Sequence, residues 1–426
     1  MKDSNKVLVI GGGGREHAII HKLKESDKVS KIYCAPGNGG IARDAECVPI
    51  GVMEFDKLVD FAKSNEIDMV MVAPDDPLAA GAVDAFENAG IRAFGPNKRA
   101  AIIEGSKAFS KDLMKKYNIP TAKYEVFSNS VEAIGYIKEQ DTYPIVVKAD
   151  GLALGKGVII AETFEDAEKA VHEIMDDKVF GSAGGKVVIE EFLTGPEISV
   201  LAFTDGKTIK PMVSAQDHKR AFDNDKGPNT GGMGTFSPSR IYTDELADEC
   251  MKNIFIPTMN AMNSENRTFK GVLYFGLMKT PDGVKVIEYN CRFGDPETQV
   301  VLPRLESDLF EIFDAVIDER LNEIDIKWND GAAVCVVLAS GGYPCKYQTG
   351  YPIEGLCRAE SAGALIFHAG TKADGDNILT SGGRVLGVTA VASNLDDAIK
   401  TAYGYVDLIS FKDMHYRKDI GIKKYN

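Results

Sequence analysis

Short apolar runs alternate with helical patterns along the first hundred residues of the chain. The runs are rich in β-branched residues, as strands buried on both faces of a parallel sheet are, and lie at 7–10, 31–34, 69–72 and 91–94. Patterns with helical spacing lie between them at 16–25, 55–64 and 78–88. This alternation predicts a doubly wound α/β domain over residues 1–105.

The pattern changes after residue 105 and predicts two further domains. A helix at 107–117 precedes strands at 124–127, 145–148, 158–161 and 187–191, with a helix at 165–175. We expect this α+β unit to form a lid, at about 122–193, inserted in a central domain over 106–328. A polar linker at 325–330 follows. Strands at 332–338, 365–368 and 385–391 and a helix at 395–409 then predict a C-terminal α/β cap over 329–426.

Composition narrows the possible functions. The 426 residues carry 49 Lys plus Arg against 63 Asp plus Glu, a net charge of −14. A chain with this net negative charge lacks the positive electrostatic field that drives nucleic-acid binding. We therefore expect no nucleic-acid partner. No uncharged apolar stretch reaches the ~18 residues of a membrane span. Seven cysteines without a Cys-x-x-Cys pair, and no apolar signal region, favour a reducing compartment, and we expect the cytoplasm.

Two glycine-rich segments have the features of phosphate-binding loops. Residues 11–14 are all glycine at a predicted strand-to-helix turn, where a helix N-terminus favours an anion. The dinucleotide fingerprint needs a small residue at Glu16 and an acid near 35–38, and both are missing, which disfavours NAD. A ligand-free tight turn is the alternative. Residues 151–157 lack the spacing and the hydroxyl of a Walker A loop, but as a hairpin flap they could place Lys156 over phosphates.

Two other segments concentrate polar side chains. Residues 216–234 mix Asp, His, Lys and Arg with glycine, which favours a functional loop over a solvated connection. The run 284–292 alternates with period two and predicts a strand with Glu288, Asn290 and Arg292 on one face. A carboxylate, an amide oxygen and a guanidinium suit Mg²⁺ together with phosphate. A surface strand with polar residues facing water is the alternative.

The order of these motifs resembles that of the ATP-grasp superfamily and, within it, the glycinamide ribonucleotide synthetase family. The resemblance rests on Lys148 before the flap, on Glu288-x-Asn290-x-Arg292, and on ordered motifs from residue 7 to the 417–421 tail. The most diagnostic motifs lie at 216–220, 227–234 and 290–299. The resemblance implies an ATP-grasp architecture and an enzyme that ligates glycine to 5-phosphoribosylamine through a glycyl phosphate intermediate. The products would be glycinamide ribonucleotide, ADP and phosphate, in purine biosynthesis.

The resemblance also implies roles for individual residues. Arg292, Asp217 and Lys219 would be catalytic, and Glu288 and Asn290 would bind Mg²⁺, with Mn²⁺ as a substitute. ATP would contact Lys107, Lys148, Gly155, Lys156, Gly157, Glu190, Glu191, Phe192, Leu193 and Glu197. The small-molecule substrates would contact Gly13, Gly14, Asn38, Asp75, His218, Gly294, Asp295, Lys372 and Arg384, with Asp295 a candidate for the glycine ammonium. We expect a monomer.

The sequence departs from this family pattern at two places. Residues 274–278 carry no acid where many ATP-grasp enzymes place a further metal ligand. The metal would then rely on two side chains, phosphates and water. Asp75 stands where the family usually has a glutamate, so its carboxylate reaches one methylene less far.

Three rival functions follow from the same motifs. Another ATP-grasp ligase or carboxylase would keep the nucleotide residues but use other substrate loops. A catalytically silent nucleotide-binding homologue predicts damage at Lys148, Glu288, Asn290 or Arg292, and all four are intact. A nicotinamide dehydrogenase is the third rival, but this chain lacks two elements of the dinucleotide-binding fingerprint.

Overall fold

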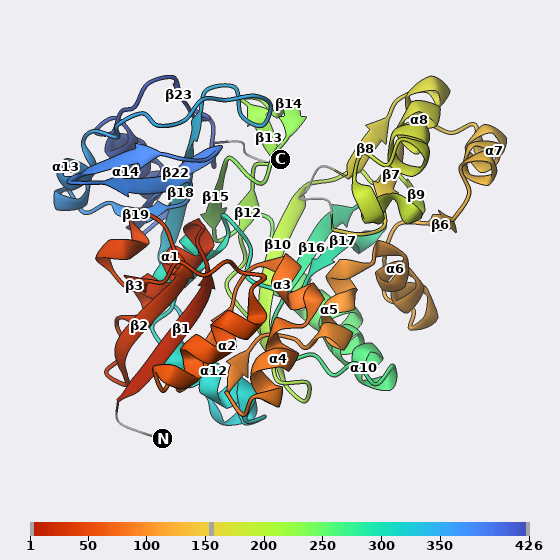
Figure 1. Ribbon diagram of the computed structural model, residues 1–426. Helices are drawn as coiled ribbons and strands as arrows, with labels where there is room; N and C mark the ends of the chain where they lie inside the picture. Colours follow the sequence, from red (N-terminus) through yellow and green to blue (C-terminus); the bar gives the residue numbers. More distant parts are fainter. Residues whose placement is uncertain (1–3, 153–156, 423–426) are drawn as a thin grey trace.

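The first sheet of the chain is parallel and has the strand order β3-β2-β1-β4-β5. The computed structural model shown in Figure 1 describes residues 4–152 and 157–422. The strands are β1 Asn5–Gly11, β2 Val29–Pro36, β3 Glu46–Cys47, β4 Met69–Val72 and β5 Ala93–Phe94. Val7 and Val9 pack into one apolar cluster and Leu8 and Ile10 into another, so β1 is buried on both faces. The doubly wound α/β domain is confirmed.

The helices of this part partly differ from the pattern-based prediction. They are α1 Gly14–Leu23, α2 Phe55–Ser64, α3 Asp75–Ala80, α4 Ala82–Asn88 and α5 Lys98–Gly105. The single helix predicted at 78–88 is wrong, because Gly81 has a φ of 101° and divides it into α3 and α4. Helix α5 was not predicted. Gly12 follows β1 and Asp75 begins α3 beyond β4, so both lie at the carboxyl ends of adjacent strands, where ligands bind in such sheets.

A four-stranded antiparallel sheet projects from one side of the molecule (Figure 1). It has the order β6-β9-β7-β8. Its elements are β6 Tyr124–Phe127, β7 Ile145–Ala149, β8 Val158–Ala161, β9 Val187–Glu191, α7 Ser130–Gln140 and α8 Phe164–Val171. Val147, Ala167 and Val187 belong to an apolar cluster of this unit alone. Strands β7 and β8 pair antiparallel, so residues 151–157 connect two strands of a hairpin.

A second antiparallel sheet, ordered β11-β10-β16-β17, forms the middle of the molecule. Its strands are β10 Glu197–Thr204, β11 Ile209–Pro211, β16 Gly271–Thr280 and β17 Gly283–Asn290. The helices α6 Lys107–Lys116, α9 Asp244–Cys250 and α10 Ile256–Ser264 belong to the same part of the chain. The strand predicted at 284–292 ends at Asn290, so Arg292 lies beyond it, in the connection to α11 Thr298–Val301.

The C-terminal sheet has the order β12-β15-β18-β22-β19, with β23 paired to β18. Its strands are β12 Gln216–Asp217, β15 Gly234–Ser237, β18 Ala332–Ser340, β19 Leu365–His368, β22 Arg384–Ala392 and β23 Met414–His415. The helices α13 Leu356–Ser361 and α14 Leu395–Val406 accompany it, whereas α12 Leu309–Ile317 packs against the N-terminal sheet, where Phe313 stacks on Phe94 of β5. Two hairpins form separate two-stranded sheets. They are β13 Arg220–Phe222 with β14 Lys226–Asn229, and β20 Thr371–Asp374 with β21 Asn377–Thr380.

The polar segment 216–234 is therefore not an irregular loop. Asp217 pairs with Thr235 in the C-terminal sheet, and the β13–β14 hairpin extends between them. Strand β15 then pairs with β18, about a hundred residues later in the chain. The segment with the Asp and Lys side chains thus joins the central part of the chain to the C-terminal sheet. Among the helices that the structure describes, none is long and apolar enough to cross a membrane.

Candidate active site

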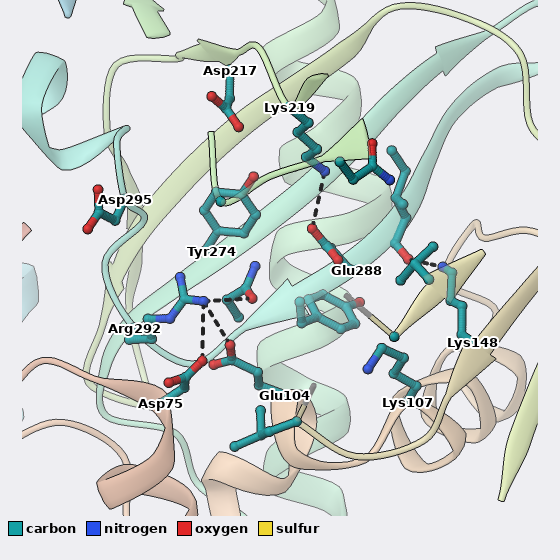
Figure 2. Close-up of a pocket in the computed structure, with 18 of the residues that line it drawn as sticks. Asp75, Glu104, Lys107, Lys148, Asp217, Lys219, Tyr274, Glu288, Arg292 and Asp295 are labelled. Atoms are coloured by element: carbon teal, nitrogen blue, oxygen red, sulfur yellow. Dashed lines mark hydrogen bonds and ion pairs between the residues drawn. The ribbon is translucent and has the colours of Figure 1, made fainter. Parts of the chain in front are cut away.

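A cavity of about 470 Å³ lies where the four parts of the chain meet. Helices α5 and α6, the unit with the β6-β9-β7-β8 sheet, β17 and the 216–234 segment all contribute to its wall (Figure 2). Twelve of the residues predicted from the sequence line it: Asp75, Lys107, Lys148, Gly157, Glu190, Asp217, Lys219, Glu288, Asn290, Arg292, Asp295 and Arg384. Residues that the family resemblance singled out therefore lie around one cavity, although they are up to 309 positions apart in the sequence.

Strand β17 presents the two oxygen ligands predicted for a metal. Glu288 lies opposite Gly276 and Asn290 opposite Tyr274 on β16, and a register shift near Ile287 adjusts the strand between Val286 and Glu288. The Lys219 ammonium, acting against burial, lowers the pKa of Glu288 to about 2. Glu288 is therefore an anion at neutral pH, and with the amide oxygen of Asn290 it forms a hard-oxygen pair that fits a divalent cation.

The predicted protein contribution to a metal at this place is the oxygen pair of Glu288 and Asn290. Among the residues that the structure describes, no group of three or more His, Cys, Asp or Glu side chains could hold a metal. A pair of oxygens is a usual protein contribution to a Mg²⁺ site in which phosphates and water complete the shell. Tyr274 and Gly276 opposite the pair bring no carboxylate, as the sequence indicated.

Lys219 bridges two acids in the wall of the cavity. Its Nζ lies 3.0 Å from Glu197 Oε2 and 3.4 Å from Glu288 Oε1. Burial alone would lower the pKa of Lys219, but Glu197 and Glu288 hold it well above its ordinary value. The backbone of Lys219 is fixed as well, because Thr230 donates to its carbonyl from both the N–H and the hydroxyl, each at 2.8 Å.

Arg292 is held by acids from the N-terminal domain. Its Nη2 lies 3.1 Å from Glu104 Oε1 and 3.6 Å from Asp75 Oδ2, and donates to Asn290 Oδ1 at 3.3 Å (Figure 2). Burial raises the pKa of Glu104, with Arg292 opposing the rise. Burial would also raise the pKa of Asp75. The positive charges of Arg292 and Arg15 outweigh burial, so the pKa of Asp75 is lowered.

The opposite end of the cavity holds a buried lysine pair around one carboxylate. Glu190 Oε2 lies 2.8 Å from Lys111 Nζ, and Glu190 Oε1 lies 2.9 Å from Lys148 Nζ. Burial lowers the pKa of Lys111 to about 8, and burial also lowers that of Lys107. Lys107 donates to the carbonyl of Gly151 at 2.9 Å. These ammonium groups give this end the positive charge that nucleotide phosphates require.

Asp217 and Glu297 place two interacting carboxylates in the cavity wall, near Tyr274. Glu297 Oε1 accepts hydrogen bonds from Ser199 Oγ at 3.0 Å and Tyr274 Oη at 3.2 Å. Asp217 Oδ1 accepts one from the His218 N–H at 2.7 Å. Burial and the negative charge of Glu297 raise the pKa of Asp217 well above its usual range. A cationic substrate group bound here would stabilise the ionised form of both carboxylates.

Arg384 from β22 ties the C-terminal sheet to the loop after β17. Its Nη1 donates to the carbonyls of Gly231 at 2.6 Å and Asp295 at 2.9 Å, while Nη2 lies 3.4 Å from Asp295 Oδ2. Gln299 Nε2 donates to Asp295 Oδ1 at 2.8 Å. Burial alone would raise the pKa of Asp295, but Arg384 outweighs it and leaves this pKa lowered. Arg384 thus holds Asp295 in place.

Ten predicted residues lie outside the cavity lining. His218 is buried with Nδ1 3.2 Å from the Gly234 carbonyl, and its Nε2 accepts the Gly421 N–H at 3.3 Å. Asn38 is committed to backbone groups through all its side-chain polar atoms. Lys372 is exposed on β20. The others are Gly13, Gly14, Glu191, Phe192, Leu193, Glu197 and Gly294. Gly155 and Lys156 fall outside the described residues.

Several cavity residues were not singled out from the sequence. They are Arg15, Glu104, Lys111, Tyr274, Glu297 and Tyr343. Glu104 and Glu297 lie inside motifs that carried the family resemblance, so proximity to Lys107 and Asp295 was an available signal. Lys111 lies four residues after Lys107 on α6, so helical periodicity, which puts both on one face, was an available signal.

Comparison with known proteins identifies the family. The chain matches three models of phosphoribosylglycinamide synthetase: the N domain at 5–104, the ATP-grasp (A) domain at 105–298 and the C domain at 333–423. It is 51% identical over 417 residues to a phosphoribosylamine–glycine ligase of Halalkalibacterium halodurans, covering 98% of this chain and 96% of that protein.

Solved structures agree with this result. The crystal structure of phosphoribosylamine–glycine ligase from Thermotoga maritima superimposes with a TM-score of 0.84 at 32% identity, covering 98% of this chain and 100% of that one. The biotin carboxylase domain of a Hydrogenobacter thermophilus 2-oxoglutarate carboxylase, at 17% identity and a TM-score of 0.72, covers 97% of this chain and 91% of that one and shows the fold alone. The chain therefore belongs to the phosphoribosylglycinamide synthetase family, whose central domain is an ATP-grasp domain.

Proposed function

We propose that the protein ligates glycine to 5-phosphoribosylamine, converting ATP to ADP and phosphate and forming glycinamide ribonucleotide. One observation carries this proposal beyond family membership. A single cavity contains the oxygen pair Glu288 and Asn290, the guanidinium of Arg292 and the ammonium groups of Lys107 and Lys148. These groups match the charges of a nucleotide, a divalent cation and a phosphorylated carboxylate.

The reaction needs an activated carboxylate, because a carboxylate oxygen is a poor leaving group. Transfer of the γ-phosphoryl group forms an O–P bond to glycine and breaks the bond to ADP. The sugar-linked amine then attacks the carbonyl carbon, the C–O bond to phosphate breaks, and the amine nitrogen loses a proton. Neither step requires a covalent bond to the protein, so positioning and charge stabilisation supply the rate. In this scheme Arg292 stabilises the acyl phosphate.

We assign the ATP contacts to the lysine-rich end of the cavity. Lys107 and Lys148 would bind phosphates, and Glu190 would lie beside the adenine. The backbone of residues 191–193 would bind the adenine edge, and Glu197 the ribose hydroxyls. Support comes from Lys148 and Glu190, which already form a buried ion pair in the cavity wall. The part assigned to Gly155 and Lys156, closing over the phosphates, stays a prediction from the sequence.

The substrate assignments concentrate on the opposite end. Asp217 and Asp295 are acids suited to the glycine ammonium, and Asp75 remains the candidate for a ribose hydroxyl. Gly13 and Gly14 lie at the start of α1, with Gly13 as its N-cap. Because Asn38, His218 and Arg384 already have protein partners, we assign them a part in shaping this end of the cavity.

Glu288 and Asn290 would hold a divalent cation, which we propose to be Mg²⁺, with Mn²⁺ as a substitute. When bound, the cation neutralises charge that develops on the transferred phosphoryl group. The protein's own part is to keep Glu288 ionised, and Lys219 does so. Binding of Mn²⁺ to the wild type and to Glu288→Gln, followed by electron paramagnetic resonance, tests this assignment without turnover.

The experiment that tests the function is phosphate release with single omissions. The complete mixture contains ATP, Mg²⁺, glycine and phosphoribosylamine generated in situ. We expect release that requires all four components and a product with the mass of glycinamide ribonucleotide. Release without glycine, or with bicarbonate in its place, would contradict the proposal and favour a carboxylase.

We also propose that the protein acts as a monomer in the cytoplasm. All seven cysteines are free thiols, as is usual in a reducing compartment. Light scattering at working concentration gives the mass, and a dimer that dissociates with loss of activity would contradict the proposal.

A further inference from the structure

Glu104 binds both the backbone and the side chain at the end of β17. It lies near the end of α5, and its Oε2 accepts a hydrogen bond from the Cys291 N–H at 2.7 Å. Its Oε1 lies 3.1 Å from Arg292 Nη2. The side chain of Glu104 is 7% exposed. One buried carboxylate therefore holds two consecutive residues of another part of the chain.

Arg292 depends on such a partner because strand pairing does not reach it. Strand β17 ends at Asn290, and the register with β16 ends there too. The other contacts of its guanidinium are longer: 3.3 Å to Asn290 Oδ1, 3.3 Å to the Phe293 carbonyl and 3.6 Å to Asp75 Oδ2. Among the described residues, Arg292 Nε is buried with no hydrogen-bond partner, which leaves a donor available to a ligand oxygen.

The pair also connects two of the matched family domains. Glu104 is the last residue matched by the N-domain model, and Arg292 lies within the ATP-grasp match. A hydrogen-bonded carboxylate–guanidinium pair fixes direction as well as charge. The orientation of Arg292 is thus set by the domain whose glycine-rich turn, at Gly12–Gly14, lies at the carboxyl end of β1.

We propose that Glu104 is a positioning residue, which orients Arg292 toward the acyl phosphate and acts on the reaction only through Arg292. The inference deepens the proposed ligase function and rests on it. A misplacement of about 1 Å in a group that binds the reacting phosphate can reduce the rate on the order of a hundredfold. Loss of this positioning should lower kcat and leave the KM for ATP unchanged, because the proposed ATP contacts lie at the other end of the cavity.

A double-mutant cycle tests this inference. Glu104→Gln keeps an acceptor for the Cys291 N–H but removes the charge opposite Arg292. We expect kcat of Glu104→Gln to fall about tenfold to a hundredfold with the KM for ATP nearly unchanged. In the Arg292→Met background the same substitution should change kcat less than about twofold, because the group it orients is gone. Glu104→Asp, which keeps the charge, should recover part of the loss.

The matched control is another buried carboxylate that pairs with arginine. Asp314 lies 2.7 Å from Arg92 and 3.0 Å from Arg320, outside the cavity lining. Asp314→Asn should lower the melting temperature and leave kcat unchanged. An equal loss of kcat in this control would overturn the proposal. So would a Glu104→Gln effect that is the same with and without Arg292, or an unchanged kcat in Glu104→Gln.

The wild-type measurement separates this inference from the function on which it rests. Wild-type protein that releases no phosphate with glycine and the sugar amine would overturn both. If the wild type is active but the effects of Glu104→Gln and Arg292→Met on kcat are additive, only the part assigned to Glu104 is overturned. If Glu104→Gln yields no folded protein by circular dichroism, Glu104→Asp in both backgrounds provides the same comparison.

Discussion

The ammonium of Lys219 lies 3.4 Å from Glu288 Oε1, so the proposed metal ligand is already paired with a protein cation. The same ammonium contacts Glu197 at 3.0 Å. Lys219 therefore stabilises the ionised form of Glu288 but also repels a divalent cation that approaches it. The cavity is thus built so that metal and lysine compete for one carboxylate, while both can neutralise phosphate charge.

Removal of this lysine should separate the two effects. In Lys219→Met we expect the Mn²⁺ affinity of the protein to rise, because a like charge near Glu288 is gone. Turnover should fall about 10²-fold or more, the usual result when a group that stabilises developing charge is lost. Metal titration by electron paramagnetic resonance and steady-state phosphate release measure the two quantities. Weaker Mn²⁺ binding in this variant would contradict the competition.

Loss of the metal ligand itself should abolish turnover without unfolding the protein. Glu288→Ala removes most of the negative charge that the chain offers to the cation. We expect kcat to fall at least about 10²-fold while the melting curve retains its cooperativity. Turnover near the wild-type level would show that the metal assignment is wrong.

His218 should make stability depend on pH in the mildly acidic range. Burial first, and then the positive charge of Arg417, lowers its pKa to about 4 from 6.5. The unfolded chain thus binds a proton that the folded chain excludes, and this stability is present above pH 6.5 and lost as the pH falls to about 4. A difference of 2.5 units corresponds to about 3 kcal/mol.

Denaturant unfolding between pH 4 and 7.5 measures this contribution. The variant His218→Asn cannot take up the proton, so its stability should fall less steeply over this window than that of the wild type. The comparison of the two slopes removes the contributions of the other histidines. Parallel curves would contradict a buried neutral ring at His218.

Lys111, buried at the nucleotide end of the cavity, should contribute both to the stability of the fold and to the binding of ATP. Among the residues that the structure describes, Lys111→Met leaves Lys148 as the one cation paired with Glu190. Breaking a buried pair costs about 3–5 kcal/mol when the remaining charge is unpaired, and because Lys148 remains we expect about 2 kcal/mol. The KM for ATP should rise several-fold. The exposed Lys115 on the same helix provides the control Lys115→Met, which should change neither quantity.

The sequence predicts the relative positions of side chains where local periodicity decides the geometry. Glu288 and Asn290 share a strand, and the alternation of side chains brought both to the cavity. Arg292 reaches the same cavity from beyond the strand end, through its contact with Glu104. That contact joins residues 188 positions apart, so no local pattern contains it.

His218 shows the opposite case. A histidine between an aspartate and a lysine is typical of a reaction centre, but its ring faces Gly234 and Gly421. Gly421 is 203 positions away, and sequence spacing carries no information about that contact. Lys111 shares a helix face with the predicted Lys107, but its ion pair with Glu190 joins residues 79 positions apart, and sequence spacing does not contain that contact.

The pairing of β15 with β18 has a consequence for how the protein is made. Strand β15 follows directly after the segment with Asp217 and Lys219, yet its partner begins at Ala332. Arg384 and Gly421, which hold this wall of the cavity, are synthesised later still. During synthesis from the N-terminus, Lys107, Lys148 and Glu190 of the nucleotide end therefore leave the ribosome before this wall can close. The wall can close only after residues up to Gly421 have been made.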